Sequence, residues 1–434
     1  MIIKCLDEIL DLHFEKIKDE KKYLENLCKA FDDFSVSLKE SKEKLAILQA
    51  KESGKPIRYC KVELERCDEL VNQAIAYIRY KNIYGYYEKI KIEKRLPIGI
   101  VLAITTFSSP YSSFFHKIIP AIISGNLFVF VPSAKVCSCS MTMFTMLEQC
   151  MTMYLNYMDK RVFCIDTKLI KSNEIVNQVK FDYILFTGKS ETAALIKQQI
   201  GYCHGMFETG SNAMAYVDDT IEDIGSLAEN LVYAAFAQSG MRCIGLKNLF
   251  IQKEIGELLI RQIIFHTKKI IKGNPLDSDV VVGPIYDTEN RTTLLENIGY
   301  LKESGYQVIE GGYVENDILV PTVLLDLNGD ILSTKEMYGP VLCIHIVRDF
   351  EDIKQEYYQR SSLNTAFFTK DLNEANRFIE YCNTCGTICI NFGPDKRDDK
   401  LPFGGLFDEN DGKEDLESLV KALSIEQKVL FGDI

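Results

Sequence analysis

The first 82 residues carry apolar positions at helical spacing among many lysines and glutamates. Leu70, Ala74 and Ile78, for example, fall on one face of a helix because they are four positions apart. Gly54 and Pro56 interrupt the pattern. It therefore predicts amphipathic helices with a break at these two residues, and the charge runs between the apolar positions are expected to be solvated helix faces.

The segment from Tyr84 to Arg95 has a different period, because apolar and charged residues alternate along it. This alternation is typical of a half-exposed β-strand. An exposed strand presents unpaired backbone groups, so we expect it to pair with another strand, including one in a second subunit.

From Leu96 onward the chain shows short apolar runs closed by turns rich in Thr, Ser and Pro, at residues 98–104, 127–131 and 181–188. Helix-like segments separate the runs, which predicts strands of a buried parallel sheet. Ligands of open α/β sheets bind at the carboxyl ends of strands, so the turns after these runs are expected to line one crevice. The chain contains no Gly-x-Gly-x-x-Gly motif.

The pattern restarts after residue 243, with a predicted strand at 246–252, a helix at 254–272, and later strands after Glu336, at 365–369 and at 386–391. We therefore predict an α/β fold with a second unit following the first. No internal repeat, low-complexity tract or flexible linker is evident.

Composition narrows the class of protein further. The chain has 434 residues, which is enough for two or three domains. Its 14 cysteines are irregularly spaced and no secretory leader opens the sequence, so we expect a reducing, cytoplasmic location. No apolar run reaches the roughly 18 residues of a membrane helix. A net charge of -12 disfavours nucleic acid as a partner.

Cys382 and Cys385 have the spacing of only half a zinc site, so no metal is predicted.

Two residues indicate covalent catalysis. Glu208 stands at a glycine-bearing turn, and Cys243 follows a small Ser-Gly pair and Arg242. A carboxylate and a thiol of this kind can act as general base and nucleophile. A free thiol has a pKa of about 8.5, so we expect Arg242 and nearby N–H groups to raise the thiolate fraction. The alternative is that Cys243 is simply buried, as free cysteines often are.

Eight segments occur in an order that resembles the aldehyde dehydrogenase superfamily over most of the chain. They are residues 97–101, 104–110, 117–126, 186–188, 208–210, 240–243, 336–340 and 402–405. Residues 132–135 and Arg397 with Asp398 are most similar to the lactaldehyde and non-phosphorylating glyceraldehyde-3-phosphate dehydrogenases.

The resemblance implies two Rossmann-like parallel-sheet domains plus a small oligomerisation hairpin. It implies an NAD(P)-binding domain at residues 1–83 and 99–207, a catalytic domain at 208–400, and oligomerisation strands at 84–98 and 420–434. It also implies assembly into a homodimer or homotetramer.

The resemblance further implies a reaction: NAD(P)-dependent oxidation of a small hydroxylated or anionic aldehyde to its carboxylate. Cys243 would attack the aldehyde and Glu208 would activate water, with Lys117 near the base. Arg242 and Arg397 would bind an anionic substrate, although a surface salt bridge is an equal alternative for Arg397. The residues implied to bind NAD or NADP are Thr105, Thr106, Phe107, Val131, Ser133, Lys135, Thr187, Gly188, Lys189, Glu336 and Tyr338.

Several departures from the family pattern leave alternatives open. Ser108 stands where the family has an oxyanion-hole asparagine, which exchanges an amide for a single hydroxyl donor. Ala134 with Lys135 or Lys189 favours NADP, whereas Val131 in place of a lysine argues the other way, so both cofactors remain possible. A catalytically impaired paralogue that binds or assembles, and a CoA-acylating aldehyde dehydrogenase, are the alternative functions.

Overall fold

The computed structural model describes residues 2–4, 8–9, 14, 17–81, 83, 85–87, 91–155, 161–169, 175–177, 179–210, 212–328, 336–359, 362–406 and 410–431. Two long helices, α2 (Glu20–Ser53) and α3 (Ile57–Tyr80), lie near the start of the chain. The predicted break is confirmed: α2 ends at Gly54 with a φ of 78°. A Cβ at Gly54 would lie 2.2 Å from the Pro284 carbonyl oxygen, so a side chain there is excluded.

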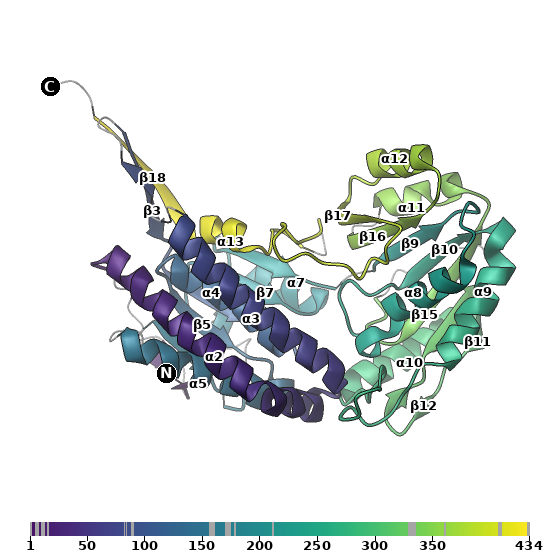
Figure 1. Ribbon diagram of the computed structural model, residues 1–434, viewed down its shortest axis with the longest axis horizontal. Coiled ribbons are helices and arrows are strands. Elements are labelled where there is room, and N and C mark those ends of the chain that lie inside the picture. Colours follow the sequence, from purple (N-terminus) through teal and green to yellow (C-terminus); the bar gives the residue numbers. More distant parts are fainter. Residues whose placement is uncertain are drawn as a thin grey trace.

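The first sheet has six strands in the order β1-β6-β5-β4-β7-β8, and all of its pairings are parallel. Helix α4 and helix α5 lie between α2 and this sheet (Figure 1). The elements are β1 (Ile2–Ile3), β4 (Ile100–Ile104), α4 (Pro110–Ile123), β5 (Leu127–Val131), η1 (Ala134–Val136), α5 (Cys137–Tyr154), β6 (Val162–Ile165), β7 (Tyr183–Thr187), α7 (Ser190–Gln199) and β8 (His204–Glu208).

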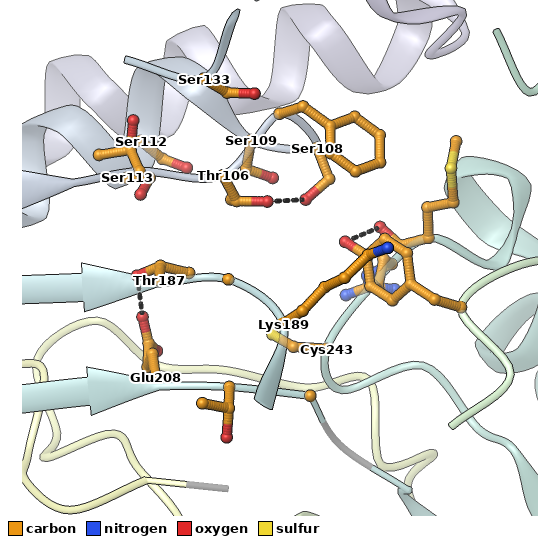
Figure 2. A pocket seen from close by; sticks show the side chains of 18 of the residues that line it. Thr106, Ser108, Ser109, Ser112, Ser113, Ser133, Thr187, Lys189, Glu208 and Cys243 are labelled. Carbon is orange, nitrogen blue, oxygen red and sulfur yellow. Dashed lines mark hydrogen bonds between the residues drawn. The ribbon is translucent and has the colours of Figure 1, made fainter. Parts of the chain in front are cut away.

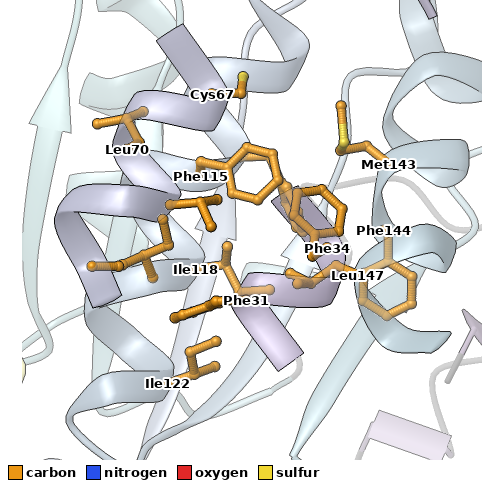
Figure 3. Close-up of a cluster of buried hydrophobic side chains, with 14 of the residues drawn as sticks. Phe31, Phe34, Cys67, Leu70, Phe115, Ile118, Ile122, Met143, Phe144 and Leu147 are labelled. Carbon is orange, nitrogen blue, oxygen red and sulfur yellow. The ribbon is translucent and has the colours of Figure 1, made fainter. Parts of the chain in front are cut away.

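An aromatic core joins these helices to the sheet. Figure 3 shows Phe31 and Phe34 of α2 facing Phe115 of α4, with Phe144 of α5 nearby. The rings of Phe34 and Phe115 have centroids 5.3 Å apart, and all four side chains are almost completely buried. Burial of side chains this large dominates the stability of such a layer. The strand ends that form the site are therefore anchored to a rigid base.

The second sheet has seven strands in the order β11-β14-β15-β10-β9-β16-β17. Every pairing is parallel except that of the edge strand β11 with β14, which is antiparallel. The elements are β9 (Met214–Val217), α8 (Ile224–Phe236), η3 (Ala237–Gly240), β10 (Asn248–Gln252), α9 (Lys253–Lys268), α10 (Thr288–Glu303), β11 (Tyr306–Glu310), β12 (Val314–Glu315), β13 (Ile318–Leu319), β14 (Thr322–Asp326), β15 (Val341–Val347), η4 (Phe350–Asp352), α11 (Lys354–Gln359), β16 (Ser362–Phe368), α12 (Leu372–Tyr381) and β17 (Cys385–Ile390).

A three-stranded antiparallel sheet projects from the first lobe (Figure 1). It contains β2 (Gly85–Tyr87), β3 (Lys91–Pro97) and β18 (Ser424–Leu430), and β18 follows the short helix α13 (Leu416–Ala422). Strands β3 and β18 pair along their whole length, from Lys91 opposite Leu430 to Pro97 opposite Ser424. The prediction of a single strand from Tyr84 to Arg95 is wrong, because the segment contains β2 and β3, which pair antiparallel with each other and place Gly85 opposite Lys94. Tyr84 and residues 88–90 of that segment lie outside the described residues.

The α/β class with two sheets of mainly parallel strands is as predicted. The antiparallel edge strand β11 and the small β12–β13 hairpin were not predicted. In the described part of the chain, no helix combines the length and the apolar character needed to span a membrane.

Candidate active site

A deep cleft with a volume of about 2140 Å³ lies between the two large sheets. The turns after β4, β5 and β7 contribute residues 104–109, 131–135 and 186–194 to one wall. The other side contains residues 238 and 241–244 as well as Glu336 and Tyr338. A pocket for one drug-sized ligand has about 300–1,000 Å³, so this cleft has room for a long cofactor together with a substrate.

The cleft brings together nearly all of the residues that the sequence pointed to. Lys117 is the exception, since it lies completely buried behind the cleft wall. Figure 2 shows Thr106 and Ser108 on the turn after β4, Thr187 and Glu208 at the ends of β7 and β8, and Cys243 facing the same space. The predicted residues that line the cleft are Thr105, Thr106, Phe107, Ser108, Val131, Ser133, Lys135, Thr187, Gly188, Lys189, Glu208, Arg242, Cys243, Glu336, Tyr338 and Arg397.

The turn before Cys243 has an unusual backbone. Gln238, Ser239 and Gly240 have φ angles of 56°, 59° and 66°, so three consecutive residues are left-handed. For a residue other than glycine this conformation costs on the order of 1–3 kcal/mol and persists only where the surroundings enforce it. The buried Ser239 hydroxyl accepts a 2.9 Å hydrogen bond from the Gly283 N–H. The Ser-Gly pair is therefore a fixed turn.

Loops from three parts of the chain meet at this turn. A Cβ added to Gly240 would lie 2.1 Å from the Gly339 carbonyl oxygen, and one added to Gly210 would lie 1.8 Å from Glu336 Oε2. Tyr338 donates a 3.2 Å hydrogen bond from its hydroxyl to the Met241 carbonyl. Glycine is required at Gly240, where the neighbour is backbone, whereas at Gly210 the neighbour is the end of a side chain. The segments carrying Glu208, Cys243 and Glu336 are thereby held in direct contact.

The thiol of Cys243 is protonated in this arrangement. Burial, the largest cause, and the Glu208 carboxylate together raise its pKa to about 11, although the Arg397 and Arg242 guanidinium groups oppose both effects. Arg242 lowers the pKa of this thiol, as expected, but desolvation of the thiolate outweighs the two cations. Reaction of Cys243 therefore requires a base that removes its proton.

Glu208 has the properties of such a base. Burial, the largest cause, and the neighbouring Glu414 carboxylate together raise its pKa to about 7, although Lys117 and Arg397 oppose them. Thr187 donates a 3.0 Å hydrogen bond to Glu208 Oε2 and accepts a 2.7 Å hydrogen bond from Lys117 Nζ. A carboxyl group with a pKa near the working pH accepts and releases protons efficiently.

Carboxylates hold the arginines of the cleft. Arg242 donates to the Asp395 carboxylate at 3.1 Å and to its carbonyl at 2.7 Å. Arg397 donates to Asp399 at 2.7 Å and to Glu414 at 3.0 Å. Arg397 thus forms salt bridges, as the alternative expected, but they are largely buried in the cleft and do not lie on the surface.

A third arginine joins the same cluster. Arg66 donates two hydrogen bonds to Asp399, at 2.5 and 2.6 Å, and its guanidinium lies 2.8 Å from His116 Nε2. Burial lowers the pKa of His116 to about 3, and the two neighbouring arginines add to this effect. His116 is therefore neutral at pH 7. The guanidinium groups hold the pKa of Asp399 at about 2 in spite of burial.

The start of helix α4 is closed by a side chain from α3. Glu63 accepts hydrogen bonds from the Tyr111 N–H at 2.9 Å and the Ser112 N–H at 3.0 Å through one oxygen. Its second oxygen forms a buried ion pair with Lys55 at 2.6 Å. Lys55 also donates to the Ser108 carbonyl at 3.3 Å, so the ion pair supports the turn that carries Ser108.

Helix α7 offers a contrasting helix start. Its N-cap residue Lys189 makes no capping hydrogen bond through its side chain, and the first turn of the helix lines the cleft. Open N–H groups at a helix start bind anions such as phosphate. In addition, the buried Thr105 hydroxyl has no hydrogen-bond partner among the described residues and lies at the cleft wall. An open helix end and an unused hydroxyl fit a dinucleotide.

Two lysines cross the cofactor side of the cleft. Lys135 forms an ion pair with Asp287, the N-cap of α10, and Lys189 pairs with Glu289 at 3.1 Å. Lys135 also lies 5.4 Å from the centre of the Phe107 ring. Both lysines thus have carboxylate partners on the second lobe, which reduces their attraction for a ribose 2′-phosphate.

Sequence reasoning missed several residues of this site. No local motif singles out Glu414, Asp399 or His116, and their partners are distant in the chain. The missed residues are Lys55, Glu63, Arg66, His116, Lys247, Asp287, Asp395, Asp399 and Glu414. The Gly-Lys-Pro break at residues 54–56 was a usable signal for Lys55, because a lysine at a buried helix junction requires a partner.

Comparisons with known proteins agree with this geometry. A model of the aldehyde dehydrogenase family matches residues 21–427. The lactaldehyde dehydrogenase of Methanococcus aeolicus is 30% identical over 396 residues, covering 89% of this chain and 83% of that protein. The 3-sulfolactaldehyde dehydrogenase of Priestia aryabhattai is 24% identical over 435 residues, covering 96% and 89%. Glyceraldehyde-3-phosphate dehydrogenase GapN from Methanocaldococcus jannaschii, solved with NADP, is 26% identical with a TM-score of 0.88, covering 96% of this chain and 91% of that one.

Proposed function

Because the chain belongs to the aldehyde dehydrogenase family, we propose that it oxidises a small hydroxylated or anionic aldehyde to the carboxylate with NAD or NADP. The observation that carries the proposal is the placement of Cys243 and Glu208 in one cleft, beside a wall that fits a dinucleotide. The names of the relatives support a lactaldehyde-like substrate.

In the proposed reaction Cys243 attacks the carbonyl carbon after Glu208 has taken the thiol proton, directly or through water. The sulfur–carbon bond forms and the carbonyl oxygen becomes an oxyanion, to which the Ser108 hydroxyl donates. A nicotinamide held beside Glu336 and Tyr338 would supply the hydride acceptor that the oxidation of this carbon requires. Glu208 next removes a proton from water, which attacks the resulting thioester and releases the carboxylate and the Cys243 sulfur.

The pKa of Glu208 suits it to both of these steps. At a value of about 7 the carboxyl group is divided between its two forms near neutral pH, so it can take a proton and return it to solvent. Lys117 and Thr187 fix one of its oxygens. The retention of Glu208 favours hydrolysis of the thioester over transfer to CoA, because thiol transfer does not need this base.

Cofactor contacts are part of the same proposal. We assign Thr105, Thr106, Phe107, Val131, Ser133, Gly188 and the start of α7 to the NAD(P) wall. Glu336 and Tyr338 lie beside the nucleophile turn, where they would hold the nicotinamide half. We further assign residues 1–83 and 99–207 to cofactor binding and 208–400 to catalysis.

The projecting sheet suits assembly. Strands β2 and β18 are the two edges of the three-stranded sheet. On β18 the Leu430 side chain is 76% exposed. An edge strand of this kind pairs readily with another chain. We therefore expect residues 84–98 and 420–434 to build a homodimer or homotetramer, and light scattering after size exclusion would contradict this if it found a monomer.

The test of the function is the rate of NADH and NADPH formation with lactaldehyde, glyceraldehyde 3-phosphate, glycolaldehyde and succinic semialdehyde, with and without CoA. Turnover without CoA is expected, and Cys243→Ala should remove it while cofactor binding, measured as a thermal shift, persists. Substantial turnover by Cys243→Ala would contradict the assignment of the nucleophile. A folded protein without turnover would instead favour the impaired paralogue.

A further inference from the structure

Lys247 is a completely buried lysine at the start of strand β10, with 1% of its surface exposed. Its ammonium group donates a 2.6 Å hydrogen bond to the Gly240 carbonyl and a 3.4 Å hydrogen bond to the Gly339 carbonyl. Its own backbone is fixed between strands, since its N–H donates to Ala213 and its carbonyl accepts from Cys343. The side chain therefore extends from a rigid position and reaches two loops.

The two carbonyls belong to the loops that shape the reaction centre. Gly240 is the last of the three left-handed residues before Cys243, and Gly339 follows the segment that contains Glu336 and Tyr338. The loops touch so closely at this point that a Cβ on Gly240 would overlap the Gly339 carbonyl. Buried carbonyl oxygens need hydrogen-bond donors, because an unsatisfied buried acceptor costs free energy. The Lys247 ammonium group has three N–H donors and can serve both carbonyls.

We propose that Lys247 is a positioning residue: its ammonium group joins the Gly240 and Gly339 carbonyls and so holds the left-handed turn that directs the Cys243 sulfur into the cleft. This rests on the proposed function of Cys243. Lys247 itself touches neither substrate nor cofactor in this role. A fixed turn places the sulfur for attack in advance, which is how orientation contributes to rate.

Other contacts make the turn a closed unit around this lysine. The Ser239 side chain holds the turn from the Gly283 side, and the Tyr338 hydroxyl holds the Met241 carbonyl. Lys247 is the one cation in this set. Burial lowers its pKa to about 8, while the nearby Glu336 carboxylate supports the charged form. A neutral amine would still donate hydrogen bonds, so the clamp does not depend on the charge alone.

The experiment compares Lys247→Met with wild type. Methionine keeps an unbranched, flexible chain and removes all the donors. The first readout is the rate at which iodoacetamide alkylates Cys243 at pH 8, followed by mass spectrometry of the Cys243 peptide. The second is kcat and KM for aldehyde and cofactor, and the third is the thermal shift with NAD and NADP. Lys253→Met is the control, because Lys253 is an exposed lysine just after the same strand.

We expect Lys247→Met to lower the alkylation rate and kcat at least tenfold, with cofactor affinity within twofold of wild type. Lys247→Arg, which restores donors, should recover part of both rates, and Lys253→Met should match wild type. A folded Lys247→Met that alkylates at the wild-type rate would overturn the proposal. A role in stability alone lowers the melting temperature but leaves the reactivity of the folded fraction unchanged.

Failure to fold is also decisive. If Lys247→Met does not fold, Lys247→Gln, which keeps one amide donor for Gly240, is measured in the same way. If neither variant folds, the lysine serves the stability of the fold and the proposal is overturned. Alkylation needs no aldehyde, so this arm still tests the positioning role even if wild type oxidises none of the aldehydes. If wild type oxidises an aldehyde and Lys247→Met has the same kcat and alkylation rate, only the positioning role is rejected and the proposed function stands.

Discussion

Replacing Glu414 by glutamine should shift the pH at which the enzyme becomes active. Glu414 is buried beside Glu208, and its negative charge is the largest contribution after burial to the raised pKa of Glu208. Glutamine is nearly the same size and removes that charge. It also frees Lys117, which lies 3.2 Å from Glu414 and 3.9 Å from Glu208, to interact with Glu208 alone. Both effects favour the carboxylate form of Glu208, so its pKa should fall.

The expected size follows from the pKa itself. A rise from 4.5 to about 7 corresponds to about 3 kcal/mol, of which burial supplies the largest part. Removing the second contribution should lower the value by roughly one, to about 6. The base acts as a carboxylate, so the rate increases as pH rises through its pKa. At pH 6 about a tenth of Glu208 is ionised in wild type and about half in the variant, which is a fivefold gain relative to each plateau.

The assay is a single-turnover measurement of thioester hydrolysis between pH 5 and 9, with the acyl-enzyme followed by intact-protein mass spectrometry. Glu417→Gln is the matched control, since Glu417 lies three residues away on an exposed face and pairs with Lys421 and Lys81. An unchanged midpoint, or one that moves to higher pH in Glu414→Gln, would refute the electrostatic coupling of the two carboxyl groups.

Three further predictions concern other parts of the cleft. Ser108→Asn should raise kcat by about ten- to a hundredfold at unchanged cofactor KM, because an amide is the stronger oxyanion donor, and steady-state kinetics without any gain would contradict the role of Ser108. Glu63→Ala leaves the buried Lys55 ammonium unpaired and should lower the free energy of unfolding by about 3–5 kcal/mol in urea titrations, so a loss below about 1 kcal/mol would be against it. Asp287→Asn keeps an N-cap for α10 but frees Lys135, so the ratio of kcat/KM for NADP over NAD should rise roughly three- to tenfold at low salt; a constant ratio would show that this ion pair does not control cofactor choice.

The local sequence pattern was sufficient to predict the α/β class and several elements of the fold. The apolar runs at 98–104 and 127–131 form β4 and β5, and the break at Gly54 separates α2 from α3 as expected. These features depend on periodicity and on backbone freedom, which neighbouring residues determine. The antiparallel pairing of β11 with β14 was not predictable in this way, because it depends on how a later segment returns to the sheet edge.

The sequence allowed prediction of those site residues that follow predicted strands or belong to a short motif. Cys243, Glu208 and Ser108 were found in this way, and all three line the cleft. Their partners were not found, because Glu414 is 206 positions from Glu208 and reaches it only where the chain returns from the second lobe to pack against α4 of the first. Titration behaviour follows from such partners and from burial, so neither the protonated Cys243 thiol nor the raised pKa of Glu208 could be read from composition.

The closure of helix α4 by Glu63 has a consequence for inhibitor design. The protein supplies its own anion at that helix end, with the Lys55 ammonium as counter-ion, so a phosphate or sulfonate fragment would have to displace a buried carboxylate to bind there. At the start of helix α7 the N-cap side chain makes no capping hydrogen bond. A screen of small anionic fragments should therefore enrich compounds at the start of α7 and leave the start of α4 empty.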